Sequence, residues 1–195
     1  MYEKLYAQIA DALVEDGYIV IENALDASIS KTLSELIIKE EGFKKAGISS
    51  ASDLHVNPLI RRDSIRWLNE DNATQTIFLA ILEALRGYLN RSLYLGLKYN
   101  ESHFAIYYEG DFYEKHYDTF KNSKNRVVTV VYYLNENWDE SNGGELIIYD
   151  KDEKVLKTVI PNANTLVVFM SEDFLHEVLP TKVKRYSIAG WYRVD

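Results

Sequence analysis

The chain from about residue 93 to its end is a series of short runs rich in β-branched and aromatic residues. Turn sequences such as NSKN, NENWDESNGG and PNAN separate these runs. Valine, isoleucine, threonine and tyrosine favour strands, whereas glycine, asparagine and proline favour turns. Strands at roughly ten-residue spacing are typical of an antiparallel sandwich or jelly roll. The expected strands are HFAIYY, NRVVTVVYYL, GELIIYD, KVLKTVI, NTLVVFM and RYSIAGWYRV.

The amino-terminal part of the chain has helical periodicity instead. LYAQIADALVEDG predicts a helix that stops at Gly17, and the strand YIVIENAL follows it. SISKTLSELIIKEEG predicts a second helix, with apolar residues at three-to-four spacing. Residues 42–66 look irregular. A third helix, NATQTIFLAILEALRGYLN, is expected to begin after Asn72 as its cap.

These patterns predict a mainly β protein with amino-terminal helices (α+β). The specific architecture expected is a double-stranded β-helix, or jelly roll, buttressed by helices. A length of 195 residues suits a single domain that spans the whole chain, 1–195. Residues 1–92 are expected to supply the helical support and entry strands, and residues 93–195 the jelly-roll core.

Composition limits the kinds of site that the chain can build. It contains no cysteine, which excludes disulfides, thiolate metal sites and cysteine nucleophiles, and which suits a reducing compartment. The formal net charge of −8 argues against a broad nucleic-acid-binding surface. No apolar run reaches membrane-spanning length, and the amino terminus lacks the apolar stretch of a signal peptide. A cytoplasmic protein that binds neither nucleic acid nor membrane is therefore expected.

The segment FYEKHYDTF contains a histidine and an aspartate two positions apart, His116 and Asp118. In an extended strand, positions i and i+2 point to the same face. A histidine and an aspartate at this spacing also occur on protein surfaces by chance, so a metal site needs a third ligand. His176, in SEDFLHEV, is a candidate that the fold would have to bring close. Two histidines and one carboxylate form a facial triad that suits non-haem Fe(II) and leaves coordination positions open.

An arginine follows the third candidate ligand in the strand KRYSIAGWYRV. Strand alternation places Arg185 on the same face as Ser187, Ala189 and Trp191. An arginine that points into an apolar interior is costly unless it meets an anion. A guanidinium binds a carboxylate through two parallel hydrogen bonds. A metal triad with an inward arginine predicts a metal-chelating ligand with a distant carboxylate, and 2-oxoglutarate fits that description.

These motifs resemble the Fe(II)/2-oxoglutarate-dependent oxygenases of the prolyl 4-hydroxylase superfamily, and among them the oxygen-sensing prolyl hydroxylases and their bacterial relatives. That family has H-x-D, a distal histidine and a basic residue about nine positions later, and the chain has all four residues in this order. The resemblance runs from about residue 10 to the end. Further similar segments are ALVEDGYIVIENAL, RRDSIRWL at 61–68, VVTVVYYLNENWD at 127–139, and SNGGEL.

The resemblance implies roles for individual residues. His116, Asp118 and His176 match the iron ligands, and Arg185 matches the residue that binds the distal carboxylate of 2-oxoglutarate. Tyr133 matches a tyrosine that assists this arginine.

The resemblance also assigns residues to the cosubstrate site for which the sequence leaves an alternative. Tyr107 matches a tyrosine that lines it, with Tyr108 as the alternative because loop lengths vary within the family. Thr129 shares a strand face with Tyr133 and is assigned to the same site.

Three residues are expected on the substrate side of the iron. Tyr113 and Arg126 match positions near the prolyl substrate, and Trp191 matches an aromatic residue close to the iron. The loop before His116 is shorter than in the animal oxygen sensors, and the loop after Asp118 differs by a residue. Because these loops shape the entrance, peptide specificity is not expected to transfer.

The resemblance implies an Fe(II)- and 2-oxoglutarate-dependent dioxygenase, a prolyl 4-hydroxylase that hydroxylates a prolyl residue in a protein or peptide and releases succinate and CO₂. O₂ is the oxidant, ascorbate is a candidate reductant, and elongation factor Tu is the candidate protein substrate suggested by bacterial relatives. One alternative keeps the chemistry but acts on a free amino acid or another small substrate. Another is a sandwich that binds metal or ligand without turnover.

Overall fold

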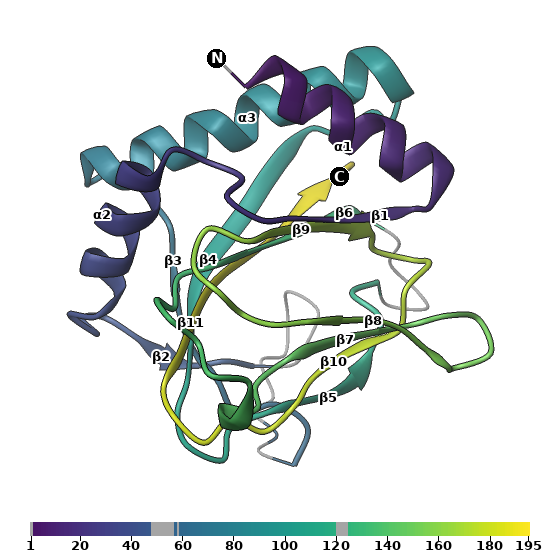
Figure 1. Cartoon of the computed structure of the whole chain (residues 1–195). Helices are drawn as coiled ribbons and strands as arrows, with labels where there is room; N and C mark the ends of the chain where they lie inside the picture. The colour runs from purple at the N-terminus through teal and green to yellow at the C-terminus, as the bar shows by residue number, and fades with distance from the viewer. Residues whose placement is uncertain (1, 48–56, 58, 120–124) are drawn as a thin grey trace.

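Two antiparallel sheets face each other in the computed structural model, which describes residues 2–47, 57, 59–119 and 125–195 (Figure 1). Within these residues the larger sheet has the strand order β1-β9-β6-β11-β4-β3-β2, and the smaller sheet has the order β5-β10-β7-β8. This arrangement confirms the predicted jelly roll. The larger sheet is formed by β1 (Tyr18–Ile21), β2 (Lys44–Lys45), β3 (Ser64–Trp67), β4 (Tyr99–Tyr107), β6 (Arg126–Tyr133), β9 (Leu166–Met170) and β11 (Arg185–Arg193).

The smaller sheet is formed by β5 (Tyr113–His116), β7 (Leu146–Tyr149), β8 (Val155–Val159) and β10 (His176–Val178), and a 3₁₀ turn, η1 (Glu140–Asn142), precedes β7. Side chains from both sheets fill the space between them. Val167 and Phe169 of the larger sheet belong to the same buried cluster as Leu146, Ile148 and Val178 of the smaller one. An apolar cluster therefore lies between the two sheets.

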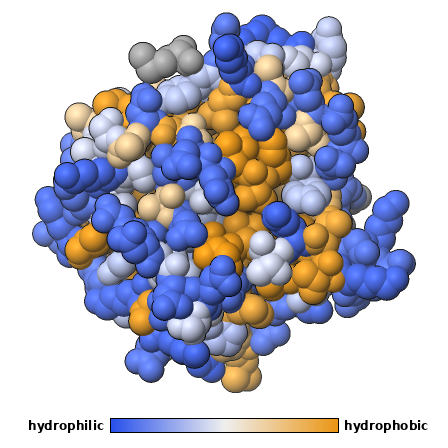
Figure 2. All heavy atoms as spheres, in the orientation of Figure 1, coloured by the Kyte–Doolittle hydropathy of each residue, from blue (hydrophilic) through white to orange (hydrophobic). Residues whose placement is uncertain are grey.

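The three helices of the described residues cover the outer face of the larger sheet, an arrangement that Figure 1 shows. They are α1 (Glu3–Glu15), α2 (Ala27–Ile37) and α3 (Ala73–Leu93). Their apolar residues, such as Ile9, Leu33 and Phe78, cluster with strand residues such as Phe104 and Tyr132. Because side chains alternate along a strand, one face of the larger sheet packs against the helices and the other faces the smaller sheet. On the face drawn in Figure 2, the surface is mostly hydrophilic, with one band of hydrophobic side chains running down from the region of α1.

The expected boundaries of α1 and α3 are confirmed to within three residues, whereas α2 ends at Ile37 and not at Gly42 as expected. The side chain of Asn72 accepts hydrogen bonds from the backbone N–H groups of Thr74 and Gln75, at 2.9 and 3.4 Å, as a cap does. Gly17 follows α1 with a φ of +78°, a conformation that glycine adopts without strain. The strand after Gly17 ends at Ile21, earlier than the expected segment YIVIENAL.

Part of the segment expected to be irregular is paired instead. Ser64–Trp67 forms β3, which pairs with β4 on one side and with β2 on the other. The sequence pattern did not indicate these short strands, because β2 consists of two exposed lysines and β3 alternates polar with apolar residues over four positions only. Residues 48–56, also in this segment, lie outside the described residues.

Candidate metal centre

The three predicted metal ligands meet at the inner edge of the smaller sheet. His116 is the last residue of β5 and His176 the first of β10, and the two are antiparallel register partners. The Nε2 atom of His116 lies 3.6 Å from Oδ1 of Asp118, and Nε2 of His176 lies 3.5 Å from Oδ2. One ligand atom from each residue falls within 4.8 Å of the others.

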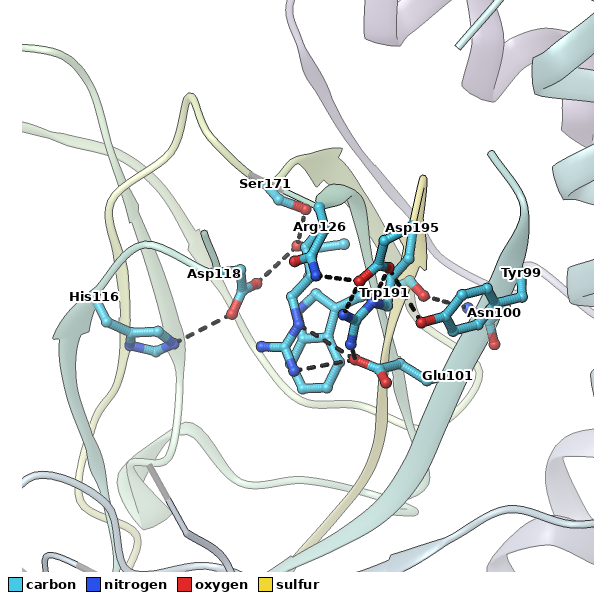
Figure 3. A network of polar contacts seen from close by, with 12 residues as sticks. Tyr99, Asn100, Glu101, His116, Asp118, Arg126, Ser171, Trp191 and Asp195 are labelled. Carbon is cyan, nitrogen blue, oxygen red and sulfur yellow. Dashed lines mark hydrogen bonds and ion pairs between the residues drawn. The ribbon is translucent and has the colours of Figure 1, made fainter. Parts of the chain in front are cut away.

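Asp118 reaches this cluster from a position different from the one expected. The sequence pattern placed His116 and Asp118 on one face of a single strand, but β5 ends at His116 and Asp118 lies in the turn beyond it. The chain leaves the sheet there and brings the carboxylate back against both imidazoles, of which Figure 3 shows that of His116. The structure brings the three residues together as expected, whereas the expected strand geometry was wrong.

The backbone fixes which nitrogen of each histidine faces the cluster. Nδ1 of His116 lies 2.7 Å from the carbonyl oxygen of Glu114, and Nδ1 of His176 lies 3.0 Å from that of Phe174. A carbonyl oxygen only accepts hydrogen bonds, so each Nδ1 carries the proton and each Nε2 has a free lone pair. Both lone pairs are directed at Asp118, which is the tautomer that metal ligation requires.

The protonation states also suit a cation. Burial lowers the pKa of His176 to about 4, and the nearby His116 lowers it as well, so its imidazole is neutral at neutral pH. Burial by itself would raise the pKa of Asp118, but His176, His116 and a hydrogen bond from Thr129 hold it well below its usual value. Two imidazole nitrogens and one carboxylate, without thiolate, form a donor set that fits Fe(II).

Arg185 occupies the other end of the same pocket. Its side chain is 1% exposed, and its Nε donates to the carbonyl oxygen of Gly144 at 2.7 Å, while Nη1 donates to Oγ of Ser187 at 3.3 Å. In the part of the chain that the structure describes, no carboxylate forms an ion pair with it. A buried guanidinium without a counter-charge is costly. The pocket is thus prepared for an anionic group at this end.

Two tyrosines flank this guanidinium. Its carbon lies 4.9 Å from the ring centre of Tyr107 and 5.0 Å from that of Tyr133. The buried hydroxyl of Tyr133 has no partner within hydrogen-bond limits among the described residues. Burial raises the pKa of Tyr133, although Arg185 opposes the rise. The hydroxyl is therefore a neutral group free to bond to a ligand of Arg185.

Gly144, in the segment SNGGEL, allows Arg185 to take this position. Its φ is +73°, and a Cβ built on it would lie 3.1 Å from Cδ of Arg185 and 3.1 Å from Cβ of Thr181. A side chain here would strain the backbone and push the arginine. The glycine is needed both for its conformation and for the close approach of the guanidinium to its carbonyl group.

The alternative between two neighbouring tyrosines is resolved by strand register. Tyr107 pairs with Arg185 and lines the pocket. Tyr108 points the other way and donates from its hydroxyl to Glu40 at 3.1 Å. The ring that faces the pocket is therefore that of Tyr107.

Of the three residues expected on the substrate side, two line the pocket and one does not. Tyr113 lines the pocket and stacks on His116, with ring centres 3.6 Å apart and 15° between the planes. Trp191 also lines the pocket. Arg126 lies behind it, with its guanidinium carbon 3.7 Å from the centre of the Trp191 ring and a 3.1 Å ion pair to Glu101 (Figure 3). Arg126 does not itself line this pocket as the structure describes it.

Thr129 lines the pocket, but its hydroxyl bonds to Asp118. Its Oγ1 lies 2.7 Å from Oδ2 of Asp118 and 2.8 Å from Oγ of Ser171. The assignment of Thr129 to the cosubstrate site rested on strand parity alone, which gives the face of a side chain and not its partner.

Two basic residues that sequence reasoning did not assign to the pocket also line it. Arg61 forms a two-bond ion pair with Asp63, at 2.6 and 2.8 Å, and lies over the ring of Tyr113. His103 is 1% exposed, and burial, with Arg61 next, lowers its pKa to about 4. The motif RRDSIRWL held the signal for Arg61, because it places an arginine and an aspartate two positions apart, although both precede β3 in the structure.

Among the described residues, no helix combines the length and hydrophobicity required to cross a lipid bilayer.

Comparison with known proteins identifies a family. Residues 102–193 match the model of the 2OG-Fe(II) oxygenase superfamily. The chain is 27% identical to "Hypoxia-inducible factor prolyl hydroxylase" of Caenorhabditis elegans over 93% of its own length and 27% of that protein. It is 28% identical to "Prolyl hydroxylase EGLN3" of Mus musculus, over 94% of the chain and 81% of the relative.

Solved structures are similar over nearly the whole chain. A prolyl-4-hydroxylase of Pseudomonas putida has a TM-score of 0.87 and 34% identity, covering 97% of this chain and 99% of that one. A prolyl hydroxylase from Trichoplax adhaerens, solved with a peptide fragment of the hypoxia inducible factor oxygen degradation domain, has a TM-score of 0.84 and 30% identity. The two chains are covered to 98% and 90%, respectively.

Proposed function

The chain belongs to the 2OG-Fe(II) oxygenase superfamily, and we propose that it is a prolyl hydroxylase acting on a protein or peptide. Fe(II) and O₂ serve the reaction, 2-oxoglutarate is the cosubstrate, and succinate and CO₂ are released. The similarity to the Pseudomonas putida prolyl-4-hydroxylase over almost all of both chains supports the reaction class. The Trichoplax adhaerens relative with its bound peptide supports a peptide or protein substrate.

One observation carries the proposal most directly: a single pocket has a metal-type donor set at one end and, at the other, a buried arginine that has no ion pair among the described residues. His116, Asp118 and His176 supply the donors, and Arg185 supplies the cation. A ligand that chelates a metal and ends in a distant carboxylate matches both ends. 2-Oxoglutarate has this shape, with an oxo acid group at one end and a carboxylate at the other.

Each side chain has a defined task in this proposal. His116, Asp118 and His176 would hold Fe(II), which when bound supplies open coordination positions for the oxo acid and for O₂. Arg185 binds the distal carboxylate by charge and paired hydrogen bonds, and the hydroxyl of Tyr133 adds a third donor. Apolar wall residues, among them Leu146 and Val178, exclude water from the reacting groups.

Tyr107, Tyr113, Arg126 and Trp191 have less direct roles. Tyr107 packs against the Arg185 guanidinium and keeps it in place. Tyr113 and Trp191 offer aromatic surface to a prolyl ring at the substrate side of the pocket. Arg126 supports the Trp191 ring from behind through a cation–π contact.

The finer identity of the partners is also part of the proposal. Elongation factor Tu is the candidate substrate, because the resemblance extends to bacterial prolyl hydroxylases. A cytoplasmic setting fits a cysteine-free chain. Ascorbate is the reductant to supply in the assay.

The proposal is tested by incubating the purified protein with Fe(II), 2-oxoglutarate, ascorbate and either elongation factor Tu, prolyl peptides or free proline. Succinate formation above the substrate-free rate, with a gain of one oxygen atom on a prolyl residue, is the expected result. Turnover of free proline alone would favour the small-substrate reading. Binding of metal and 2-oxoglutarate without any succinate would reject catalysis. His176→Ala should lose metal binding and turnover while its circular dichroism spectrum is retained.

A further inference from the structure

Asp118 needs an external support that its own backbone does not give. The antiparallel pairing of β5 with β10 ends at His116, so Asp118 lies beyond the last ladder position. The terminal torsion of an aspartate is also broad, with no sharp rotamer to fix the carboxylate plane. Something outside this residue must therefore set the direction of its oxygens.

The neighbouring larger sheet supplies that support. Thr129, in the middle of β6, is 2% exposed and donates from Oγ1 to Oδ2 of Asp118 at 2.7 Å. Ser171 follows β9, is completely buried, and has its Oγ 2.8 Å from the same Thr129 oxygen. The backbone N–H of Ser171 donates to the carbonyl oxygen of Val127 at 2.9 Å, which anchors it to β6. Figure 3 shows this line of contacts from Ser171 to Asp118.

The direction of the two bonds follows from the number of protons. The ionised carboxylate of Asp118 only accepts, so the Thr129 hydroxyl must donate to it. A hydroxyl has one proton to donate, so Thr129 must accept from Ser171. The relay therefore runs from Ser171 to Thr129 to Asp118, and each hydroxyl has one defined orientation.

We propose that Thr129 and Ser171 are positioning residues of the metal centre, which hold the Asp118 carboxylate in its ligating orientation before an ion binds. This inference rests on the proposed function, since it concerns the same metal site. It replaces a direct contact of Thr129 with the cosubstrate. Hydrogen bonds to ligating carboxylates orient them, and their loss typically reduces metal affinity about 10- to 100-fold.

Isothermal titration with Mn(II) alone tests the proposal without any substrate or turnover. Thr129→Val keeps the shape and the strand preference of the residue but removes the hydroxyl. We expect its Mn(II) dissociation constant to rise about 10- to 100-fold. Thr129→Ser keeps the hydroxyl and should restore affinity to within a few-fold of the parent protein. Circular dichroism and thermal unfolding of the metal-free forms check that each variant is folded.

Ser171→Ala probes the second step of the relay. Its effect on Mn(II) affinity should be smaller, roughly 2- to 10-fold, because one neutral hydrogen bond is lost at a distance from the ligand. In the Thr129→Val/Ser171→Ala double variant, the two losses should not add, because the serine acts through the threonine. Strict additivity of the two effects would contradict a relay.

The alternative role for Thr129 gives an opposite result. If its hydroxyl contacts the cosubstrate, Thr129→Val should leave the Mn(II) affinity unchanged and weaken only the subsequent binding of N-oxalylglycine, an inert 2-oxoglutarate analogue. That result, or a Thr129→Ser variant as weak as Thr129→Val, would overturn the proposal. Failure of the parent protein itself to bind Mn(II) would instead reject the metal centre and with it the proposed function.

Discussion

The guanidinium carbon of Arg185 lies 5.0 Å from the centre of the Tyr133 ring in the pocket, and the tyrosine hydroxyl there has no hydrogen-bond partner among the described residues. A buried cation and a buried, unsatisfied donor side by side are unfavourable in the empty protein. One bound carboxylate would supply the counter-charge for Arg185 and accept a hydrogen bond from the Tyr133 hydroxyl. The same pair therefore lowers the stability of the free chain and favours the ligand.

Arg185→Gln should weaken binding of 2-oxoglutarate by about 10- to 100-fold, because charge-assisted hydrogen bonds contribute roughly 1.5–3 kcal/mol. Titration of the Mn(II)-loaded protein with N-oxalylglycine measures this loss. Arg86→Gln is the matched control, since Arg86 is on α3 and pairs with Glu83 on the outer surface. An unchanged affinity in Arg185→Gln would exclude the carboxylate role.

Tyr133→Phe should separate function from stability. The variant loses the free hydroxyl, so the affinity for N-oxalylglycine should fall roughly 3- to 10-fold, equivalent to one hydrogen bond. The free energy of unfolding of the metal-free protein should stay the same or rise by up to about 1 kcal/mol, because an unsatisfied buried group is removed. Urea unfolding measures the second effect. A clear loss of stability would mean that the hydroxyl already has a partner.

Gly144→Ala should damage both the backbone and the arginine. A positive φ costs an alanine roughly 1 kcal/mol, and its Cβ would also press on Arg185. We expect reduced stability together with weaker N-oxalylglycine binding. Gly96→Ala is a close control, because Gly96 has a φ of +69° and its Cβ would meet nothing within 4 Å. That variant should lose a similar amount of stability without any loss of affinity.

The stability of the metal-free protein should fall as the pH drops from about 6.5 towards 4. Burial lowers the pKa of His103 to about 4, Arg61 and Arg126 lower it too, and Asp63 acts against them. In this range the unfolded chain takes up a proton that the buried imidazole does not, so acid favours unfolding. Each buried histidine of this kind changes the free energy of unfolding by about 1 kcal/mol per pH unit in this range. His176, whose pKa burial also lowers to about 4, has the same effect. His103→Leu should therefore make the dependence of the unfolding free energy on pH shallower, as measured by urea unfolding at several pH values with EDTA. An unaltered slope would show that His103 does not titrate differently on folding.

Much of the fold could be predicted because the strand signal is local. Runs such as NTLVVFM and RYSIAGWYRV are long and β-branched, and both became central strands. The short strands that hold the histidines carry weaker patterns. β10 consists of His176, Glu177 and Val178 only, and its pairing depends on neighbours distant in the sequence.

The site could be predicted as a set of residues but not as a geometry. The spacing of His116, Asp118 and His176, with Arg185 after them, indicated the ligands and the anion site. The sequence pattern could not indicate that Asp118 lies beyond the strand or that Thr129 bonds to it. Those contacts depend on how the two sheets are placed against each other, which no local periodicity records.

The donor atoms of the metal centre come from three separate pieces of chain: the end of β5, the turn after it, and the start of β10. An ion bound by all three would link the edge strand β5 to its neighbour β10. Because only the folded chain brings the three donors together, ion binding stabilises the folded state. Iron-starved cells would thus contain a looser version of the protein that proteases open more readily. The abundance of the enzyme, as well as its turnover of substrate, would follow the iron supply.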